Sequence, residues 1–165
     1  MNNENILLEI RGLKKYFPVY GGFFSTQVGN VYAVVGIDFQ VKKGETLGLV
    51  GESGCGKSTL GRTIVRLYEP TAGNIIFNNQ DITKIYGKDL KHIRRNIQIV
   101  FQDPYASLNP RMTVSKILQE PFEIHNIGTQ QQRIDEVYKL FDVVGLRRDM
   151  INRYPHEFSG GQKQR

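Results

Sequence analysis

A short glycine-rich stretch, GESGCGKST from Gly51 to Thr59, combines residue types that can hold a phosphate group. It fits the spacing G-x-x-x-x-G-K-[ST], in which glycines let the backbone turn until successive N–H groups face one centre. Lys57 adds a mobile positive charge for the β- and γ-phosphates, and the Ser58 hydroxyl is placed to bind Mg²⁺. The stretch therefore predicts a nucleotide site. Its candidate residues are Gly51, Glu52, Ser53, Gly54, Cys55, Gly56, Lys57, Ser58 and Thr59.

The single cysteine, Cys55, lies inside this stretch, so the chain cannot form an internal disulfide. That agrees with a reducing compartment. A thiol at a helix N-terminus can be reactive, and we expect MgATP to protect Cys55 from alkylation. The alternative is that Cys55 is only a small filler of the loop.

A second glycine pair stands in FSGGQ, near the end of the sequence. Ser159 is followed three residues later by Gln162, which is the spacing of a capping box. Gly160 and Gly161 leave the entrance of the helix bare, so an anion could approach the backbone. A plain capped helix start explains the same residues when they are taken alone.

The phosphate-binding stretch needs a strand before it and a helix after it. The continuous apolar run at 46–50 is typical of a strand that is covered on both faces of a parallel sheet, and 96–101 is a second such run. A helical face formed by Leu60, Ile64, Leu67 and Tyr68 follows the stretch, and we expect Pro70 to end that helix.

Other elements follow from periodicity and from turn residues. We expect a strand from residue 6 that ends near Pro18, a glycine-bounded loop over 21–30 and a half-buried strand over 36–41. A short strand with a polar turn over 73–82 and a basic helix over 88–95 come next. From Met112 onward the pattern is helical: Thr113 can cap one helix that Pro121 breaks or kinks, and Gly145 can end another.

Composition bounds the class of protein. The 165 residues suit one soluble globular domain, with 39% hydrophobic and 23% charged residues. No apolar run is long enough to cross a membrane, and the start lacks the pattern of a signal peptide. The net charge of +6 suggests polyanionic partners, although a solvated face explains most of the basic residues better.

The two glycine motifs together resemble the ATP-binding subunit of ABC transporters. Gly51–Thr59 matches the Walker A motif of that family, Gln102 matches the Q-loop glutamine, and FSGGQ matches the signature with Phe158 where leucine is commoner. FQDPYASLNPRMTV and YPHEFSGGQKQR are similar to the bacterial dipeptide and oligopeptide importers in particular. Nickel and glutathione importers look similar, so the transported solute stays open.

This resemblance implies an α/β fold of the P-loop NTPase class, an ABC nucleotide-binding domain that is truncated. Residues 1–102 would form the β subdomain and part of the P-loop core, and residues 103–165 the helical subdomain and the start of the signature. ATP would lie on the phosphate loop with Phe17 or its rival Tyr16 stacked on adenine; the alternative is that both rings belong to the core. Gln102 would contact Mg²⁺ or the attacking water, so that Lys57 and Gln102 are the candidate catalytic residues, and Ser58 and Gln102 the candidate metal ligands.

The same resemblance implies the partners. Ser159, Gly160, Gly161 and Gln162 would contact ATP held by a second ATP-binding subunit in a head-to-tail dimer. Transmembrane permease subunits would dock near 105–113, an extracellular solute-binding protein would act indirectly, and no nucleic acid is expected. The location would be the cytoplasmic face of a bacterial cell membrane.

The family continues beyond its signature with an apolar strand that ends in Asp-Glu and supplies Mg²⁺ binding and water activation. This sequence stops first, because of a truncated gene, an incomplete gene model or a shortened protein. We therefore expect nucleotide binding without hydrolysis. The alternatives are an ABC-type ATPase module that acts on nucleic acid or ribosomes, and a non-functional remnant.

Overall fold

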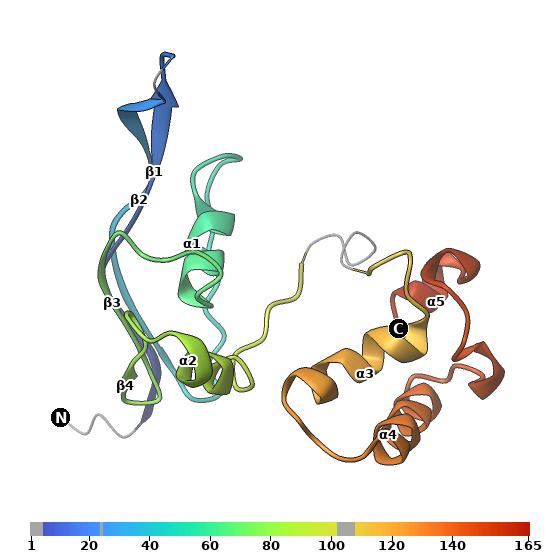
Figure 1. Ribbon diagram of the computed structural model, residues 1–165. Helices are drawn as coiled ribbons and strands as arrows, with labels where there is room; N and C mark the ends of the chain where they lie inside the picture. The colour runs from blue at the N-terminus through green and yellow to red at the C-terminus, as the bar shows by residue number, and fades with distance from the viewer. Residues whose placement is uncertain (1–4, 24, 102–107) are drawn as a thin grey trace. The chain divides into compact units, whose positions relative to one another are not determined.

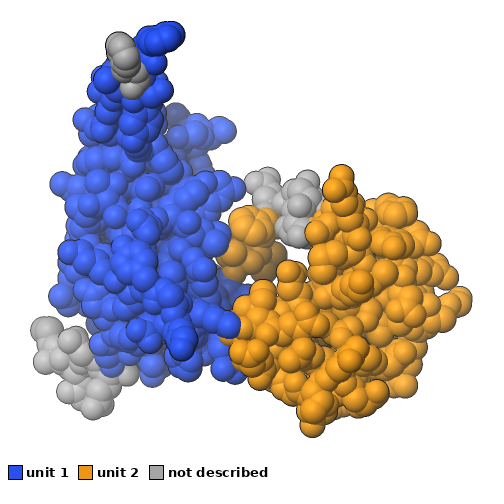
Figure 2. Space-filling model, in the orientation of Figure 1, with its two compact units in different colours: residues 1–98 blue, residues 99–165 orange. Residues whose placement is uncertain are grey.

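The computed structural model describes residues 5–23, 25–101 and 108–165. Contacts divide the chain into two compact units, residues 1–98 and residues 99–165, which are coloured separately in Figure 2. The first unit carries the phosphate-binding stretch and the second carries the signature. Each unit is described by itself below.

Unit 1 is built on an antiparallel sheet with the strand order β2-β1-β3-β4. Its strands are β1 (Ile6–Gly21), β2 (Thr26–Lys42), β3 (Ala72–Phe77) and β4 (Gln80–Asp81) (Figure 1). The β3–β4 hairpin turns through Asn78 and Asn79, whose φ values are +47° and +63°. Asparagine tolerates this left-handed conformation, which two-residue hairpin turns require.

The β1–β2 hairpin is longer than the sequence pattern predicts. β1 continues past Pro18 to Gly21, and β2 already begins at Thr26, so the expected end of the first strand and most of the expected loop over 21–30 are wrong. β3 pairs with β1 only between Leu8 and Lys14. Pro18 therefore lies where β1 has β2 as its only partner strand among the described residues, and its missing N–H breaks no ladder there.

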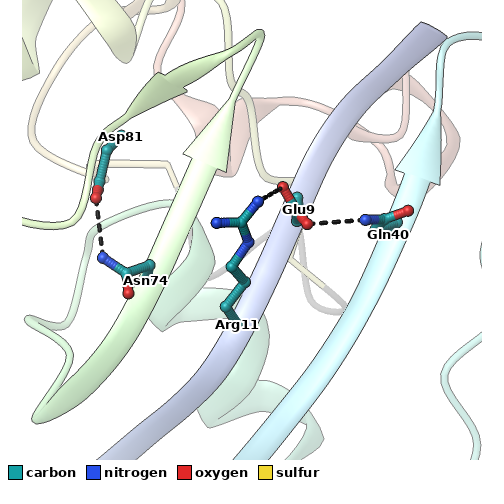
Figure 3. A network of polar contacts seen from close by, with 5 residues as sticks. All are labelled: Glu9, Arg11, Gln40, Asn74 and Asp81. Carbon is teal, nitrogen blue, oxygen red and sulfur yellow. Dashed lines mark hydrogen bonds and ion pairs between the residues drawn. The ribbon is translucent and has the colours of Figure 1, made fainter. Parts of the chain in front are cut away.

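Helices cover one face of this sheet and polar side chains line the other. α1 (Lys57–Ile64) and α2 (Gly87–Ile93) contribute to a single apolar core, whose buried members are Ile10, Leu13, Val34, Leu60, Ile75, Ile82 and Ile93. Figure 3 shows the polar network: Arg11 and Gln40 both donate to the Glu9 carboxylate, at 2.8 Å each, and Asn74 donates to Asp81 at 2.9 Å. The alternation predicted for 36–41 is confirmed from Phe39 to Val41, whereas Ile37 is 37% exposed.

Two predicted strands do not form. Residues 46–50 and 96–101 lie outside every helix and strand, and Val50 and Val100 are 95% and 90% exposed. A strand needs a neighbour for its backbone N–H and C=O groups, and no described strand lies beside either run. The prediction of a strand at each of these two runs is therefore wrong for this chain.

The end of α1 also differs from the prediction. The helix stops at Ile64, six residues before Pro70, and Arg66 adopts a left-handed φ of +58°. The Arg66 side chain is 3% exposed and donates to the carbonyls of Ile82 and Ile85 at 3.1 and 3.2 Å. These bonds tie the end of α1 to the segment that follows β4, and Leu67 is left 48% exposed.

Unit 2 is helical, as the sequence predicts. It contains α3 (Val114–Ile124), α4 (Gln130–Val143), the 3₁₀ turns η3 (Arg148–Met150) and η4 (Pro155–Glu157), and the short helix α5 (Gly160–Lys163). Its buried core consists of Val137, Phe141, Met150, Ile151 and Phe158. None of the helices in the described part of the chain is long and apolar enough to cross a membrane.

Proline and glycine act differently at the ends of these helices. α3 runs through Pro121 to Ile124, so the predicted break is wrong. A proline near the end of a helix removes one N–H donor, and only one more turn remains to be disturbed. Gly145 has a φ of +66° directly after α4 and confirms the predicted stop.

Candidate functional site

The phosphate loop is shaped by two glycines with left-handed backbone. Gly54 and Gly56 have φ values of +82° and +96°, and Gly56 is the N-cap of α1. A Cβ at Gly56 would lie 2.2 Å from the carbonyl oxygen of Ala33 in β2. Only glycine fits this position, because any side chain would meet both the backbone strain and the strand. The spacing that predicts the loop thus corresponds to a real steric demand.

Lys57 turns its ammonium group onto the loop that precedes it. Its Nζ donates to the carbonyls of Gly51 and Glu52 at 2.6 and 2.5 Å, and lies 3.5 Å from Cys55 Sγ. Carbonyl oxygens are the neutral counterparts of phosphate oxygens, with which an ammonium group forms stronger bonds. The structure therefore places this charge where an anion inside the loop would meet it.

The backbone amides of the loop are largely unengaged. The Cys55 N–H donates to Glu52 at a long 3.4 Å. The N–H groups of Gly54, Gly56, Lys57 and Ser58 have no acceptor among the described residues. The first turn of α1 contains no acidic residue, and no side chain caps the helix. Unengaged amides at the positive end of a helix fit an anion such as a triphosphate.

A hollow of about 370 Å³ lies beside this loop. Its lining includes Cys55, Gly56 and Lys57 from the loop and apolar side chains of β2 and of the exposed run before the loop, namely Val35, Ile37, Leu49 and Val50. Cys55 is exposed, so its thiol is open to reagents.

The two candidate adenine-stacking residues have different neighbours. Tyr16 packs edge-on against Tyr32 of β2, with ring centroids 4.7 Å apart. Phe17 packs edge-on against Tyr68, which follows α1, at 5.4 Å. The Lys15 ammonium lies 4.7 Å from the centroid of the Phe17 ring. These ring contacts connect the Phe17 side chain to the segment that follows α1, whereas Tyr16 meets that segment through its backbone N–H, which donates to the Thr71 hydroxyl at 2.9 Å.

The signature segment in unit 2 has the geometry of a capping box. The Ser159 hydroxyl accepts from the Gln162 N–H at 3.3 Å, and the Gln162 side chain accepts from the Ser159 N–H at 2.9 Å. Gly160 and Gly161 begin α5, and a Cβ at Gly161 would meet nothing within 4 Å. The predicted capping box is confirmed, and the space beside Gly161 is open.

Some predicted residues cannot be placed, and some contacts were missed. Gln102 lies outside the described residues, as does the start of the predicted docking region at 105–113. Thr113 is the N-cap of α3, but its side chain makes no capping hydrogen bond. The contact of Tyr68 with Phe17 was not predicted, because it joins residues some fifty positions apart and no local pattern carries such information. The contact of Lys15 with Phe17, two positions along the same strand, was not predicted either.

Comparisons with known proteins agree with this arrangement. Residues 34–165 match the family described as ABC transporter. The chain is 56% identical over 164 residues to the oligopeptide transport ATP-binding protein AppF of Bacillus subtilis and 52% identical over 161 residues to OppF of the same organism. These alignments cover 99% and 96% of this chain but 50% of each relative. The chain thus spans about half the length of the curated relatives it matches.

Solved structures show the same fold. The dimeric bacterial ABC transporter cassette MJ0796 matches with a TM-score of 0.74 at 25% identity, covering 96% of this chain and 66% of that one. The protein cbiO1 of Clostridium perfringens, part of the ABC transporter complex cbiONQ, matches with a TM-score of 0.66 at 28% identity, covering 98% of this chain and 59% of that one. The fold class predicted from the sequence, an α/β P-loop NTPase of the ABC type, is confirmed.

Proposed function

Because the chain belongs to the ABC transporter family, we propose that it is the ATP-binding portion of an importer subunit that energises uptake of dipeptides or oligopeptides. The peptide transport proteins AppF and OppF support the substrate class. ATP hydrolysis is an activity of the family, and the observation that carries the proposal for this chain is the phosphate loop. The Lys57 ammonium group points onto the loop, where it donates to the Gly51 and Glu52 carbonyls, and most backbone N–H groups of the loop have no acceptor among the described residues.

Different groups of the loop would bind different parts of the MgATP complex. The N–H groups from Gly54 to Ser58 would receive phosphate oxygens, and Lys57 would exchange the Gly51 and Glu52 carbonyls for the β- and γ-phosphates. Ser58 stands in the first turn of α1, where its hydroxyl would contact Mg²⁺, and Gln102 would be a second Mg²⁺ or water contact. Mg²⁺ would supply charge neutralisation at the phosphates.

The signature segment would serve a neighbouring subunit. Ser159, Gly160, Gly161 and Gln162 would contact the γ-phosphate of ATP on a second ATP-binding subunit in a head-to-tail dimer. Transmembrane permease subunits would dock on unit 2, and an extracellular solute-binding protein would deliver the solute. The assembly would lie at the cytoplasmic face of the bacterial membrane.

Calorimetric titration of the chain with MgATP tests the proposal. We expect binding to wild type and at least about a tenfold loss of affinity in Lys57→Ala, because one charge-assisted bond is removed. Lys43→Ala removes an exposed lysine of the same unit and should bind like wild type. Equal affinity of wild type and Lys57→Ala would overturn the proposed site.

Turnover is measured on the same samples. We expect no sustained hydrolysis of MgATP by these 165 residues, because the family binds Mg²⁺ and polarises water with an Asp-Glu pair that ends an apolar strand. The Asp-Glu pair in this sequence, Asp135 and Glu136, lies within the helix α4 instead. Sustained hydrolysis that disappears in Lys57→Ala would contradict that expectation while leaving nucleotide binding intact.

A further inference from the structure

Neighbouring aromatic residues of β1 face different surroundings. Successive residues of a strand point to opposite faces of the sheet, so Tyr16 and Phe17 cannot share one neighbourhood. Lys15 and Phe17, two positions apart, both contact Tyr68: the Lys15 ammonium lies 6.0 Å from the centroid of the Tyr68 ring, and the Phe17 ring meets it at 88°. Tyr16 instead packs on Tyr32.

Tyr68 is in turn attached to the helix that the phosphate loop begins. Arg62 of α1 donates to the Tyr68 hydroxyl at 3.3 Å, and its guanidinium lies 5.9 Å from the centroid of the Tyr68 ring. The backbone N–H of Tyr68 also donates to the Arg62 carbonyl at 3.1 Å. A continuous set of contacts therefore runs from α1 through Tyr68 to the ring of Phe17.

We infer that Tyr68 is a positioning residue, which holds the Phe17 ring in a fixed orientation for stacking on the adenine base of a nucleotide bound at the phosphate loop. This inference rests on the proposed function and deepens it. It also assigns the stacking role to Phe17 rather than to Tyr16. Tyr68 itself need not touch the nucleotide, since it acts through Phe17.

The physical reason is preorganisation. A ring that is free to rotate must be immobilised when a base stacks on it, and that loss of freedom weakens binding. An edge-to-face partner at 5.4 Å and an ammonium group at 4.7 Å fix the ring in advance. The benefit appears only for ligands that carry a base, because the triphosphate contacts the loop and not this ring.

The test compares ATP with inorganic triphosphate, each with Mg²⁺, on the 165-residue chain. In Tyr68→Leu we expect the affinity for ATP to fall about fivefold and the affinity for inorganic triphosphate to stay within about twofold of wild type. Tyr68→Phe keeps the ring and should bind ATP nearly as well as wild type. Tyr20→Leu removes an exposed tyrosine of the same strand and should change neither affinity.

Three results would overturn the inference. ATP affinity that is unchanged in Tyr68→Leu would show that the ring has no positioning role. An equal loss for both ligands would show that Tyr68 supports the loop or the fold instead. A Tyr68→Phe variant as weak as Tyr68→Leu would assign the effect to the hydroxyl. If wild type binds neither ligand, the proposed function itself fails, which the wild-type titration alone reveals.

Fluorescence gives an independent readout, because the chain contains no tryptophan. In Phe17→Trp, MgATP should change the emission and inorganic triphosphate should not, and a second substitution, Tyr68→Leu, should weaken the ATP response. In Tyr16→Trp the emission should respond to neither ligand. A response in Tyr16→Trp with none in Phe17→Trp would reverse the assignment and overturn the inference.

Discussion

The phosphate loop and the signature segment both place glycines at the start of a helix, but only the signature segment has a side chain that caps the backbone N–H groups there. At α1 the N-cap is Gly56, with φ +96° and no side-chain cap. At α5 the N-cap is Ser159, with φ −65° and a complete capping box. At α1 no side chain accepts from the first backbone N–H groups, so they are available to an anion. At α5 the Ser159 hydroxyl already accepts from the Gln162 N–H. The first suits a resident phosphate, and the second suits a contact made only when a partner arrives.

The largest expected difference comes from adding one methyl group to each entrance. Gly56→Ala should destabilise the chain by about 2 kcal/mol or more, because the left-handed backbone and the Ala33 carbonyl both oppose a Cβ. Gly161→Ala has open space and should be neutral or stabilise by up to about 1 kcal/mol. Urea unfolding of both variants measures this, and equal effects would remove the steric basis of the comparison.

Bound nucleotide should also change the chemical reactivity of the phosphate loop, through its cysteine. Cys55 is exposed beside Lys57, so we expect saturating MgATP to slow its alkylation severalfold. The rate is followed by mass spectrometry, with Lys57→Ala as the control that should lose the protection. Equal labelling with and without a nucleotide that demonstrably binds would contradict the placement of Cys55 in the site.

The capping box of the signature should matter for local stability and not for binding by this chain. Ser159→Ala removes one accepted hydrogen bond and should cost about 1 kcal/mol, seen as faster amide exchange in α5. Its affinity for MgATP should equal that of wild type, because Ser159 would contact only a partner's nucleotide. A matching loss of ATP affinity would show that the two entrances are not independent.

Acid should weaken the sheet of unit 1 slightly more than it weakens the capping box in unit 2. Hydrogen bonds from Arg11 and Gln40 lower the pKa of Glu9 from its ordinary value of 4.5, so the stability they provide is present above that pH and is lost as pH falls through the lowered pKa. The Ser159 box uses only neutral groups. We expect Glu9→Gln to flatten the acid decline in urea unfolding, with Glu69→Gln as an exposed control. Parallel declines in wild type and Glu9→Gln would rule out this contribution.

Local patterns predicted the backbone geometry of the two glycine motifs better than the strands at 46–50 and 96–101. The phosphate loop and the Ser159 box are complete within nine and four consecutive residues, so their spacing carries the geometry. The strand predicted at 46–50 depends on neighbours that its own residues do not supply, and it is not formed. The contact between Phe17 and Tyr68 depends on where α1 ends, which Arg66 decides through bonds to Ile82 and Ile85. The roles of Gln102 and of the signature remain predictions.

The most direct test of the account follows the backbone amides of the phosphate loop by nuclear magnetic resonance while MgATP is added to the isotope-labelled chain. The account predicts large, saturable shifts for Gly54, Gly56, Lys57 and Ser58, whose N–H groups have no acceptor among the described residues, and small shifts for Gly160 and Gly161 at low protein concentration. Unchanged amide signals in the loop, from a folded sample at saturating nucleotide, would contradict it.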